Sequence, residues 1–492
     1  MLGLRDDMAW AIQHALEETR SAVAAVVETP HPAAVVANVA DLARSNWFLW
    51  LETSLKAPAR LSQLLPAAGM EQPSPLRWLP RALVLGAVAA DVYTGYAVLG
   101  ESAKWCAERG GPRELERQHR RGAARVLNSA LSLGGTLIKA SQFASVRPDL
   151  VPATYAQALA GLQDRVPAHP WSTIEAVIHR ELGRPICEVF GAIESEPVAA
   201  ASLAQVHRAW LVNGREVAVK VQYPDLDGLI AADLATLEGI ATTLEKLEPA
   251  VRLQPIVEHL RTTLPLEVDF RREAQASGDL RAALAHRRDV QIPAVVGELS
   301  TKHLLVTDFV DGIKITDRDA LLAARIDPTA VARTLNEVYA EQILQLGYLH
   351  ADPHPGNLLV QPGPRLVILD HGLTVQLRPH LVDALRSMVQ ALADGDFAAL
   401  SSALHNAGVA PDTGLDLTSL MEMASVLLGL NPLAGDTSFG QQLTAQVGQI
   451  PVELITVGRA LGLVSGITRA LDPDLDTFAI AAAAARPRDS LR

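Results

Sequence analysis

One loop with a fixed pattern of polar residues constrains this sequence more than any other feature. The loop reads HADPHPGN and contains Asp352 and, five residues later, Asn357. An apolar strand is predicted over 365–369, and Asp370 follows it directly. A helix predicted from the cap at Asp327 to Gly347 precedes the loop. A Pro-Gly-Pro turn separates the two short strands after the loop. The pattern therefore places two acids and an amide around one predicted hairpin.

These residue types at this spacing are those that phosphoryl transfer requires. One carboxylate, here Asp352, accepts a proton from the attacking hydroxyl or orients that hydroxyl. An amide oxygen and a second carboxylate, here Asn357 and Asp370, are suitable ligands for Mg²⁺, which prefers oxygen. Aspartate and asparagine in loops also bond commonly to nearby backbone. The spacing and the helix–loop–hairpin context favour the functional interpretation, with ATP and Mg²⁺ as cofactors.

A lysine on an upstream strand fits the same chemistry. Asn213 and Gly214 predict a hairpin turn, and VAVKV then places Lys220 among valine and alanine. A strand lysine is usually an exposed charge, but apolar neighbours on both sides make solvent exposure of both faces unfavourable. Kinases keep a phosphate-contacting lysine at such a position and pair it with a helix glutamate. Glu273, on the helix predicted over 255–280, is the candidate partner.

An alanine run stands where kinases carry a glycine-rich loop. The segment PVAAASLAQVH supplies the predicted nucleotide-binding residues Ala199, Ala200, Ala201 and Ser202. Alanine allows a helical turn there, and a helix N-terminus offers free amides to phosphate. Most alanine runs are ordinary helix, so this segment alone carries little information.

Taken together, these segments resemble the UbiB/AarF/ADCK family of atypical, protein-kinase-like proteins over 122–474. The matching segments, in chain order, are LIKASQFASVRPDLVP (137–152), AAAS (199–202), VAVKVQYP (217–224), LEVDFRREA (266–274), HADPHPGN (350–357) and PVELITVGRALGLVSGITRALDPD (451–474). The resemblance implies an α+β, bilobal protein-kinase-like fold with a small sheet-containing N-lobe and a helical C-lobe. It also implies a helical N-terminal extension that covers the nucleotide site.

The resemblance assigns roles to four further residues. A helix is predicted over 136–145. Lys139 and Gln142, three apart on one face of it, match the signature of the covering extension. Without the family match, we would interpret them as a solvated polar pair. Glu267 and Asp269 match an accessory acidic motif.

Two positions depart from the family pattern. Ser141 stands where the signature has glycine, and glycine there could permit a closer approach of a helix or ligand. His371 follows Asp370 where kinases usually have phenylalanine, so the metal ligand is kept while the packing beside it can differ.

The first 121 residues form a predicted helical region, and a membrane-facing surface is one interpretation of it. The stretch 82–100 approaches the length of a bilayer span, but Asp91 at its middle disfavours insertion. A buried or membrane-surface helix is preferred over a span. Six arginines between Arg109 and Arg125 follow it, either as a solvated face or as a surface for anionic lipid. We expect a cytoplasmic protein, peripheral at a membrane.

Length, charge and cysteine content exclude other classes. At 492 residues the chain exceeds one small module, and we expect boundaries near 1–121, 122–190, 191–310, 311–480 and a tail at 481–492. The net charge of −12 argues against a nucleic-acid partner. Two distant cysteines, Cys106 and Cys187, argue against a disulfide framework and for a reducing compartment.

The sequence favours an Mg-ATP-dependent kinase or ATPase of the UbiB type, which the resemblance associates with isoprenoid-quinone or other lipid metabolism. The implied partners are an adenine nucleotide, an isoprenoid lipid or quinone precursor, and an anionic membrane surface. Two alternatives stay open: a small-molecule phosphotransferase like the aminoglycoside and choline kinases, and a nucleotide-binding scaffold without turnover. The Lys139–Gln142 helix distinguishes the first alternative, because those kinases lack it.

Overall fold

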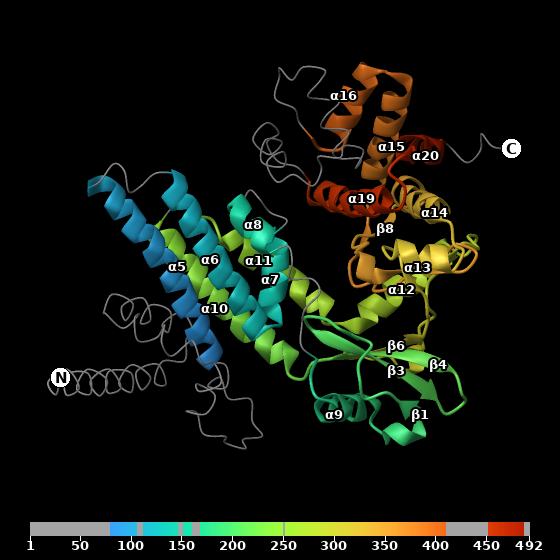
Figure 1. Cartoon of the computed structure of the whole chain (residues 1–492), viewed down its shortest axis with the longest axis horizontal. Coiled ribbons are helices and arrows are strands. Elements are labelled where there is room, and N and C mark those ends of the chain that lie inside the picture. The colour runs from blue at the N-terminus through green and yellow to red at the C-terminus, as the bar shows by residue number, and fades with distance from the viewer. Residues whose placement is uncertain are drawn as a thin grey trace. The chain divides into compact units, whose positions relative to one another are not determined.

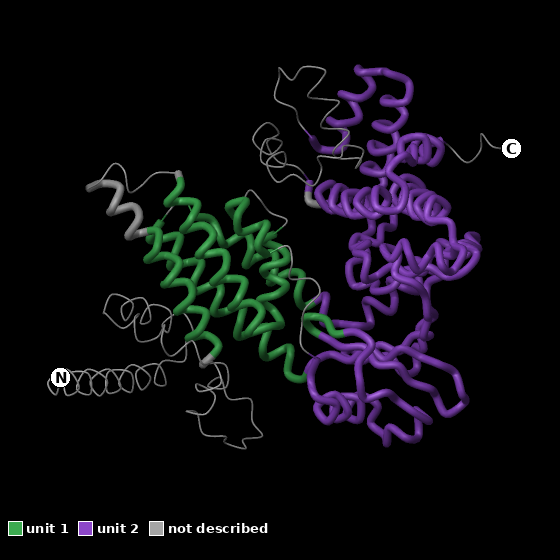
Figure 2. Tube along the Cα trace, viewed as in Figure 1, with its two compact units in different colours: residues 1–167, 200–203, 224–265 green, residues 168–199, 204–223, 266–492 purple. Residues whose placement is uncertain are grey.

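The computed structural model describes residues 79–105, 112–145, 151–159, 168–248, 251–409 and 451–486. The chain divides into two compact units (Figure 2). The helical unit comprises 1–167, 200–203 and 224–265, and the mixed unit comprises 168–199, 204–223 and 266–492. Four of the N-terminal tryptophans and part of the arginine run lie outside the described residues: Trp10, Trp47, Trp50, Trp78 and Arg109.

The helical unit packs its helices around a small apolar core. Leu85, Leu137, Ile138 and Leu159 are buried together there. Helices α5, α6 and α10 lie side by side (Figure 1). The predicted helix at 136–145 is confirmed by α7. The bounds are α5 Leu79–Trp105, α6 Pro112–Leu133, α7 Thr136–Ser145, α8 Ala153–Leu159, α10 Leu226–Leu247 and α11 Gln254–Glu267, whose last two residues belong to the mixed unit.

An arginine at the start of α5 joins three segments of the helical unit. Its side chain donates to both carboxylate oxygens of Asp233, at 2.6 and 2.9 Å, and to the carbonyls of Leu133 and Gly134. Asp233 on α10 is 1% exposed. The Arg81 guanidinium therefore satisfies a buried carboxylate and two carbonyls at the turn between α6 and α7.

The first part of the mixed unit is a small antiparallel sheet with strand order β1-β3-β4-β6, and β2 pairs with β3. The predicted hairpin is confirmed: β3 and β4 flank Asn213 and Gly214, and Gly214 has a φ of +83°. Lys220 lies opposite Val206 on β3 and Leu305 on β6. The bounds are α9 Trp171–Leu182, η3 Ile186–Glu188, β1 Phe190–Ile193, β2 Ala199–Ala200, β3 Ala204–Leu211, β4 Glu216–Gln222, α12 Phe270–Ala283, β5 Val290–Gln291, η4 Gly297–Leu299 and β6 Leu304–Asp308.

Two local expectations in this part were wrong. The alanine run does not form a helical turn, because Ala199 and Ala200 are in β2 and the Val198 amide bonds to the Val206 carbonyl of β3. The helix expected over 255–280 is two helices. Asp269 is extended between them, and its side chain accepts from the Arg271 amide to cap α12.

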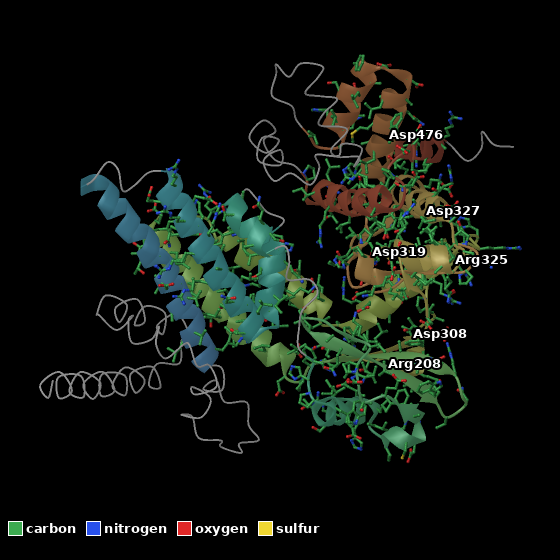
Figure 3. All side chains as sticks on the ribbon, in the orientation of Figure 1. Arg208, Asp308, Asp319, Arg325, Asp327 and Asp476 are labelled. Carbon is green, nitrogen blue, oxygen red and sulfur yellow. The ribbon has the colours of Figure 1, made fainter. Side chains whose placement is uncertain are left out.

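The second part of the mixed unit is mainly helical, with a large apolar core that includes Leu335, Tyr339, Leu385 and Met388. Asp327 caps α14 as predicted (Figure 3), and Gly347 ends the helical segment with a φ of +61°. The bounds are β7 Ile313–Lys314, α13 Arg318–Ala323, α14 Pro328–Glu341, the π-helical η5 Gln342–Leu346, β8 Tyr348–His350, η6 Pro355–Asn357, β9 Leu358–Gln361, β10 Arg365–Ile368, β11 Thr374–Gln376, α15 Pro379–Asp394, α16 Phe397–Asn406, α19 Val452–Leu471 and α20 Thr477–Ala485.

Residues 481–485, which were expected to belong to a frayed tail, are helical. Asp476 caps α20, whose alanines continue to Ala485. Ala485 is fully buried, and its carbonyl accepts from the Gln390 side chain of α15. Packing against α14 and α15 therefore holds the alanine run as helix.

Within the described residues, α19 is the one helix whose length and composition would allow it to cross a membrane. Its residues Leu454, Val457 and Ala460 are fully buried in the core of the mixed unit. These contacts are those of a core helix. The stretch 82–100 lies within α5, where Leu85 and Ala87 are buried in the helical unit.

We predict that Asp233→Asn destabilises the helical unit by about 3–5 kcal/mol, because it leaves the Arg81 charge buried without its counter-ion. The matched control is Glu238→Gln on the same helix, whose ion pair with Arg261 is 2.6 Å long and about half exposed. That change should cost less than about 1 kcal/mol. Urea unfolding followed by far-ultraviolet circular dichroism measures both, and equal losses would contradict the role given to Asp233.

Candidate active site

Three charged side chains from distant parts of the mixed unit meet at β4. The Lys220 ammonium donates to Glu273 Oε1 and Oε2, at 2.7 and 2.8 Å, and to Asp370 Oδ2 at 3.1 Å. It also lies 5.1 Å from the centre of the Phe270 ring. The strand brings Lys220 and α12 brings Glu273, while Asp370 follows β10. The structure thus brings together three residues that the sequence analysis selected.

The two carboxylates share one cation, and they differ in burial: Glu273 is 6% exposed, whereas the Asp370 side chain is 42% exposed. Burial, together with the negative charge of Asp370, raises the pKa of Glu273 to about 7 against the opposing effect of the Lys220 charge. Burial lowers the pKa of Lys220, but Asp370 and Glu273 outweigh that effect and hold it above its usual range. Lys220 is therefore protonated, and its charge stabilises both carboxylates.

Asp370 is held in an unusual backbone conformation. Its φ is +49°, and its carbonyl accepts from His350 Nε2 at 2.8 Å. Burial lowers the pKa of His350, which is neutral, so its Nδ1 accepts from the Tyr339 hydroxyl at 2.7 Å. The Gly372 amide also lies 3.2 Å from Asp370 Oδ1. A buried Tyr339–His350 pair therefore fixes the backbone that directs the Asp370 carboxylate.

The loop that carries Asp352 and Asn357 is closed by its own hydrogen bonds. The Asp352 carbonyl accepts from the His354 amide at 2.7 Å and from Asn357 Nδ2 at 3.1 Å. The Asn357 carbonyl accepts from the Leu369 amide at 2.8 Å, one residue before Asp370. The amide nitrogen of Asn357 is thus used, and its oxygen is the atom suited to a cation. Asn357 and Asp370 together offer the hard oxygen donors that Mg²⁺ prefers.

Arg459 is a residue that the sequence analysis did not select. It extends from α19, and its Nη2 lies 2.9 Å from Asp352 Oδ1. The stretch 451–474 was noted for its family resemblance, but it reads as an apolar helix. The signal available was an arginine in the middle of that apolar run, which has a second arginine, Arg469, near its end.

Burial and ring packing explain why a histidine can stand at position 371. It is 4% exposed, and burial lowers its pKa to about 3, so the ring is neutral. Among the described residues neither ring nitrogen has a hydrogen-bond partner. The ring instead packs edge-to-face against His350, with centroids 5.4 Å apart. Histidine fills this position as an aromatic ring would.

The other predicted residues lie on separate elements. Lys139 and Gln142 are on α7 of the helical unit, and the cover they would form over the nucleotide site stays a prediction. Ala199 and Ala200 are in β2, followed by Ala201 and the buried Ser202. Glu267 ends α11. Asp269 caps α12, and its hydrogen bonds with Arg271 lower its pKa. Asp269 therefore fixes the start of the helix that carries Glu273.

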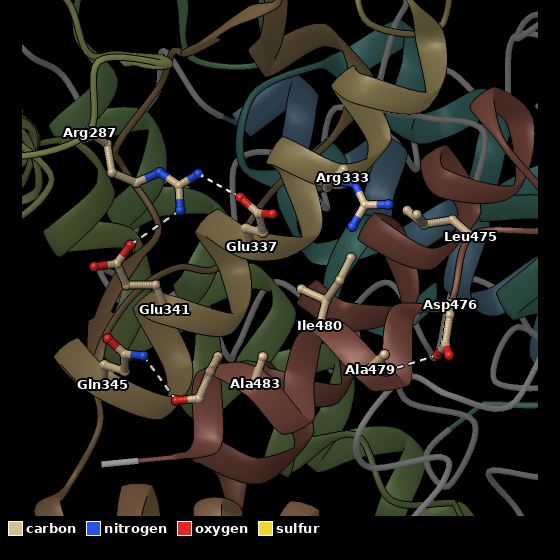
Figure 4. Close-up of a pocket in the computed structure, with 11 residues that line it drawn as sticks. Arg287, Arg333, Glu337, Glu341, Gln345, Leu475, Asp476, Ala479, Ile480 and Ala483 are labelled. Atoms are coloured by element: carbon tan, nitrogen blue, oxygen red, sulfur yellow. Dashed lines mark hydrogen bonds and ion pairs between the residues drawn. The ribbon is translucent and has the colours of Figure 1, made fainter. Parts of the chain in front are cut away.

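A separate cavity of about 620 Å³ lies between α14 and α20 (Figure 4). Its charged lining is largely paired internally, since Arg287 contacts Glu337 at 3.0 Å and Glu341 at 3.4 Å. None of the residues that contact Lys220 lines it. The cavity is not part of the site described above.

Comparison with known proteins identifies the fold and the family. The ABC1 atypical kinase-like domain matches residues 161–404. The AarF domain-containing protein kinase 1 of Xenopus tropicalis is 38% identical over 260 residues, which cover 52% of this chain and 50% of the frog protein. The uncharacterized protein sll1770 of Synechocystis is 32% identical over 395 residues, covering 77% of this chain and 67% of that protein.

A solved structure agrees with these matches. The Mycobacterium tuberculosis protein Rv3197, described as a complex with erythromycin, is 25% identical and has a TM-score of 0.52. The likeness covers 74% of this chain and 95% of that chain. The chain spans half the length of the frog AarF-domain kinases that it matches. The chain has a kinase-like α+β fold and belongs to the ABC1 atypical kinase-like family, the UbiB/AarF/ADCK family of its sequence resemblance.

Proposed function

We propose that the protein binds Mg-ATP at the Lys220–Glu273–Asp370 site and transfers the terminal phosphoryl group to a hydroxyl or to water. The observation that carries this proposal is the contact of one ammonium with both carboxylates, at 2.7 Å and 3.1 Å. In phosphoryl transfer the protein mainly positions the reactants and stabilises charge. A lysine anchored by a buried glutamate and adjacent to an aspartate at the end of a strand supplies both.

Each residue has a distinct part in this proposal. Lys220 contacts the nucleotide phosphates, and Glu273 holds the lysine in place. Asn357 and Asp370 would hold the Mg²⁺, which supplies positive charge to the phosphate oxygens when bound. Asp352 orients the attacking hydroxyl or accepts its proton. Ala199, Ala200, Ala201 and Ser202 would border the phosphates, and Lys139 and Gln142 would cover them.

We further propose that the acceptor is a lipid-like molecule of isoprenoid-quinone or related metabolism, and that the protein works at a membrane surface. The sequence resemblance supports the first point. The second is supported by α6, where Arg117, Arg120 and Arg121 have side chains that are 78%, 74% and 56% exposed. Each also contacts an acid, respectively Glu114, Glu116 and Asp91. Anionic lipid would therefore compete with these acids for the arginines.

We predict that Asp370→Asn weakens the magnesium-dependent part of ATP binding by about ten- to one hundredfold, because one charged ligand of the cation is lost. Titration calorimetry with and without Mg²⁺ measures this. Asp279→Asn, on the exposed face of α12, is the matched control and should bind as the parent does. Unchanged magnesium-dependent affinity in Asp370→Asn would show that the metal assignment is wrong.

We predict that Asp352→Asn lowers the rate of magnesium-dependent ATP turnover by about 10²–10⁴-fold and leaves nucleotide binding nearly intact. The control is Asp383→Asn on α15, a carboxylate that is 70% exposed and pairs with Arg386. ADP release and nucleotide affinity are measured on the same preparations. A mutant that turns over at the parental rate would favour the scaffold alternative or another base.

We predict that the full chain floats with anionic liposomes and that this attachment weakens in high salt, because each basic residue near such a surface contributes about 1 kcal/mol. Changing Arg117, Arg120 and Arg121 together to Glu should abolish flotation. The same change at Arg318, Arg325 and Arg333, which are exposed in the mixed unit (Figure 3 labels Arg325), should not. Protein that stays at the bottom of the gradient with every lipid would remove the membrane from the proposal.

A further inference from the structure

The carboxylate of Asp352 contacts an arginine more than a hundred residues later in the chain. Arg459 Nη2 lies 2.9 Å from Asp352 Oδ1, and the side chains are 32% and 26% exposed respectively. Both residues belong to the mixed unit. A charge-assisted hydrogen bond of this length orients a carboxylate as well as attracting it.

The backbone of Asp352 does not depend on this contact. Its carbonyl is bonded to the His354 amide and to Asn357 Nδ2, and the Ala351 amide before it donates to the Leu373 carbonyl. The loop therefore keeps its path without Arg459. What Arg459 can determine is the rotation of the Asp352 side chain.

Helix α19 is a rigid support for that arginine. Leu454, Val457 and Ala460 follow one another at intervals of three along the helix and are fully buried. The two ends of the helix are tied to other elements, because Glu453 pairs with Arg378 at 2.7 Å and Thr468 Oγ1 accepts from Asn336 Nδ2 at 2.7 Å. Because the backbone of the helix is already held in place, only the side-chain torsions of Arg459 are ordered by its contact.

We propose that Arg459 is a positioning residue: it binds Oδ1 of Asp352 and thereby directs Oδ2 toward the hydroxyl or water that attacks ATP. This inference rests on the proposed function. In the reaction the O–H bond of the acceptor breaks and its proton passes to Asp352 Oδ2. A bond forms between the acceptor oxygen and the terminal phosphorus, and the bond from that phosphorus to the bridging oxygen breaks, with its electron pair leaving on ADP.

The geometry separates this role from nucleotide binding. Among the described residues, Asp352 is the carboxylate that Arg459 contacts, whereas Lys220 contacts Glu273 and Asp370. Loss of the guanidinium should therefore lower the rate of turnover without changing the affinity for ATP. It should have no further effect once the Asp352 carboxylate has been removed, because the two residues then share one function.

The experiment measures magnesium-dependent ADP release by the full chain for the parent, Arg459→Gln, Arg459→Lys, Asp352→Asn and the Asp352→Asn/Arg459→Gln double variant. We expect Arg459→Gln to lower kcat by about tenfold with KM for ATP within about twofold, and Arg459→Lys to recover part of the loss. The double variant should be no slower than Asp352→Asn. Arg469→Gln, which changes an exposed arginine of the same helix, is the matched control and should keep the parental kcat.

Several results would overturn the inference. A parental kcat in Arg459→Gln would show that the arginine does not position the carboxylate, and a raised kcat would show that it blocks the site instead. A loss that adds to that of Asp352→Asn, or that Arg469→Gln reproduces, would show a purely structural role. A parent without turnover would refute the proposed function itself, and the inference with it. If Arg459→Gln does not fold, Arg459→Lys in both backgrounds carries the same comparison.

Discussion

The kinase-like site depends on one ammonium group that bonds to two carboxylates. Lys220 is separated by 53 residues from Glu273 and by 150 from Asp370, so strand, helix and loop must all be in place before the three meet. Burial makes the arrangement demanding, since Glu273 is 6% exposed and its pKa rises to about 7. Without the lysine, the buried Glu273 carboxylate would lie close to a second carboxylate with little solvent to stabilise its charge.

The elements around this contact are built to keep Asp370 in place. Its backbone φ of +49° lies in the left-handed region, which residues with a side chain adopt less readily than glycine. The hydrogen bond from His350 to the Asp370 carbonyl holds this backbone, and the buried Tyr339 hydroxyl bonds to the same histidine. The neutral His371 ring packs against His350. Apolar packing and a short chain of hydrogen bonds thus act on one carboxylate. The orientation of that carboxylate decides where its oxygens could bind a cation.

Two of the arginine–aspartate pairs, Arg81–Asp233 and Arg459–Asp352, have different roles. Arg81 and Asp233 are almost completely buried, and the guanidinium also satisfies two backbone carbonyls, so the pair acts as a structural joint between helices. Arg459 and Asp352 are about one-third and one-quarter exposed, at the edge of the site. Solvent weakens the second pair as a source of stability. Its directional effect on the carboxylate remains, and that effect is what chemistry at the site requires.

The sequence by itself determined the local features, because each of them follows from a short stretch of chain. The hairpin turn at Asn213 and Gly214, the cap at Asp327 and the spacing of Asp352, Asn357 and Asp370 could all be read from neighbouring residue types. The partner of Lys220 was also selected in advance, although this needed the family resemblance to restrict the choice to one lobe.

Only the tertiary structure decided the contacts that join distant segments. Ala199 and Ala200 form a strand because they pair with β3. The alanines of α20 are helical because the helix packs against α14 and α15. Arg459 looks in sequence like any polar residue on a core helix, and nothing local distinguishes it. Its role arises because folding brings it 2.9 Å from a carboxylate 107 residues away. Such a pairing depends on how helices pack, and packing is set by the whole core and not by any one segment.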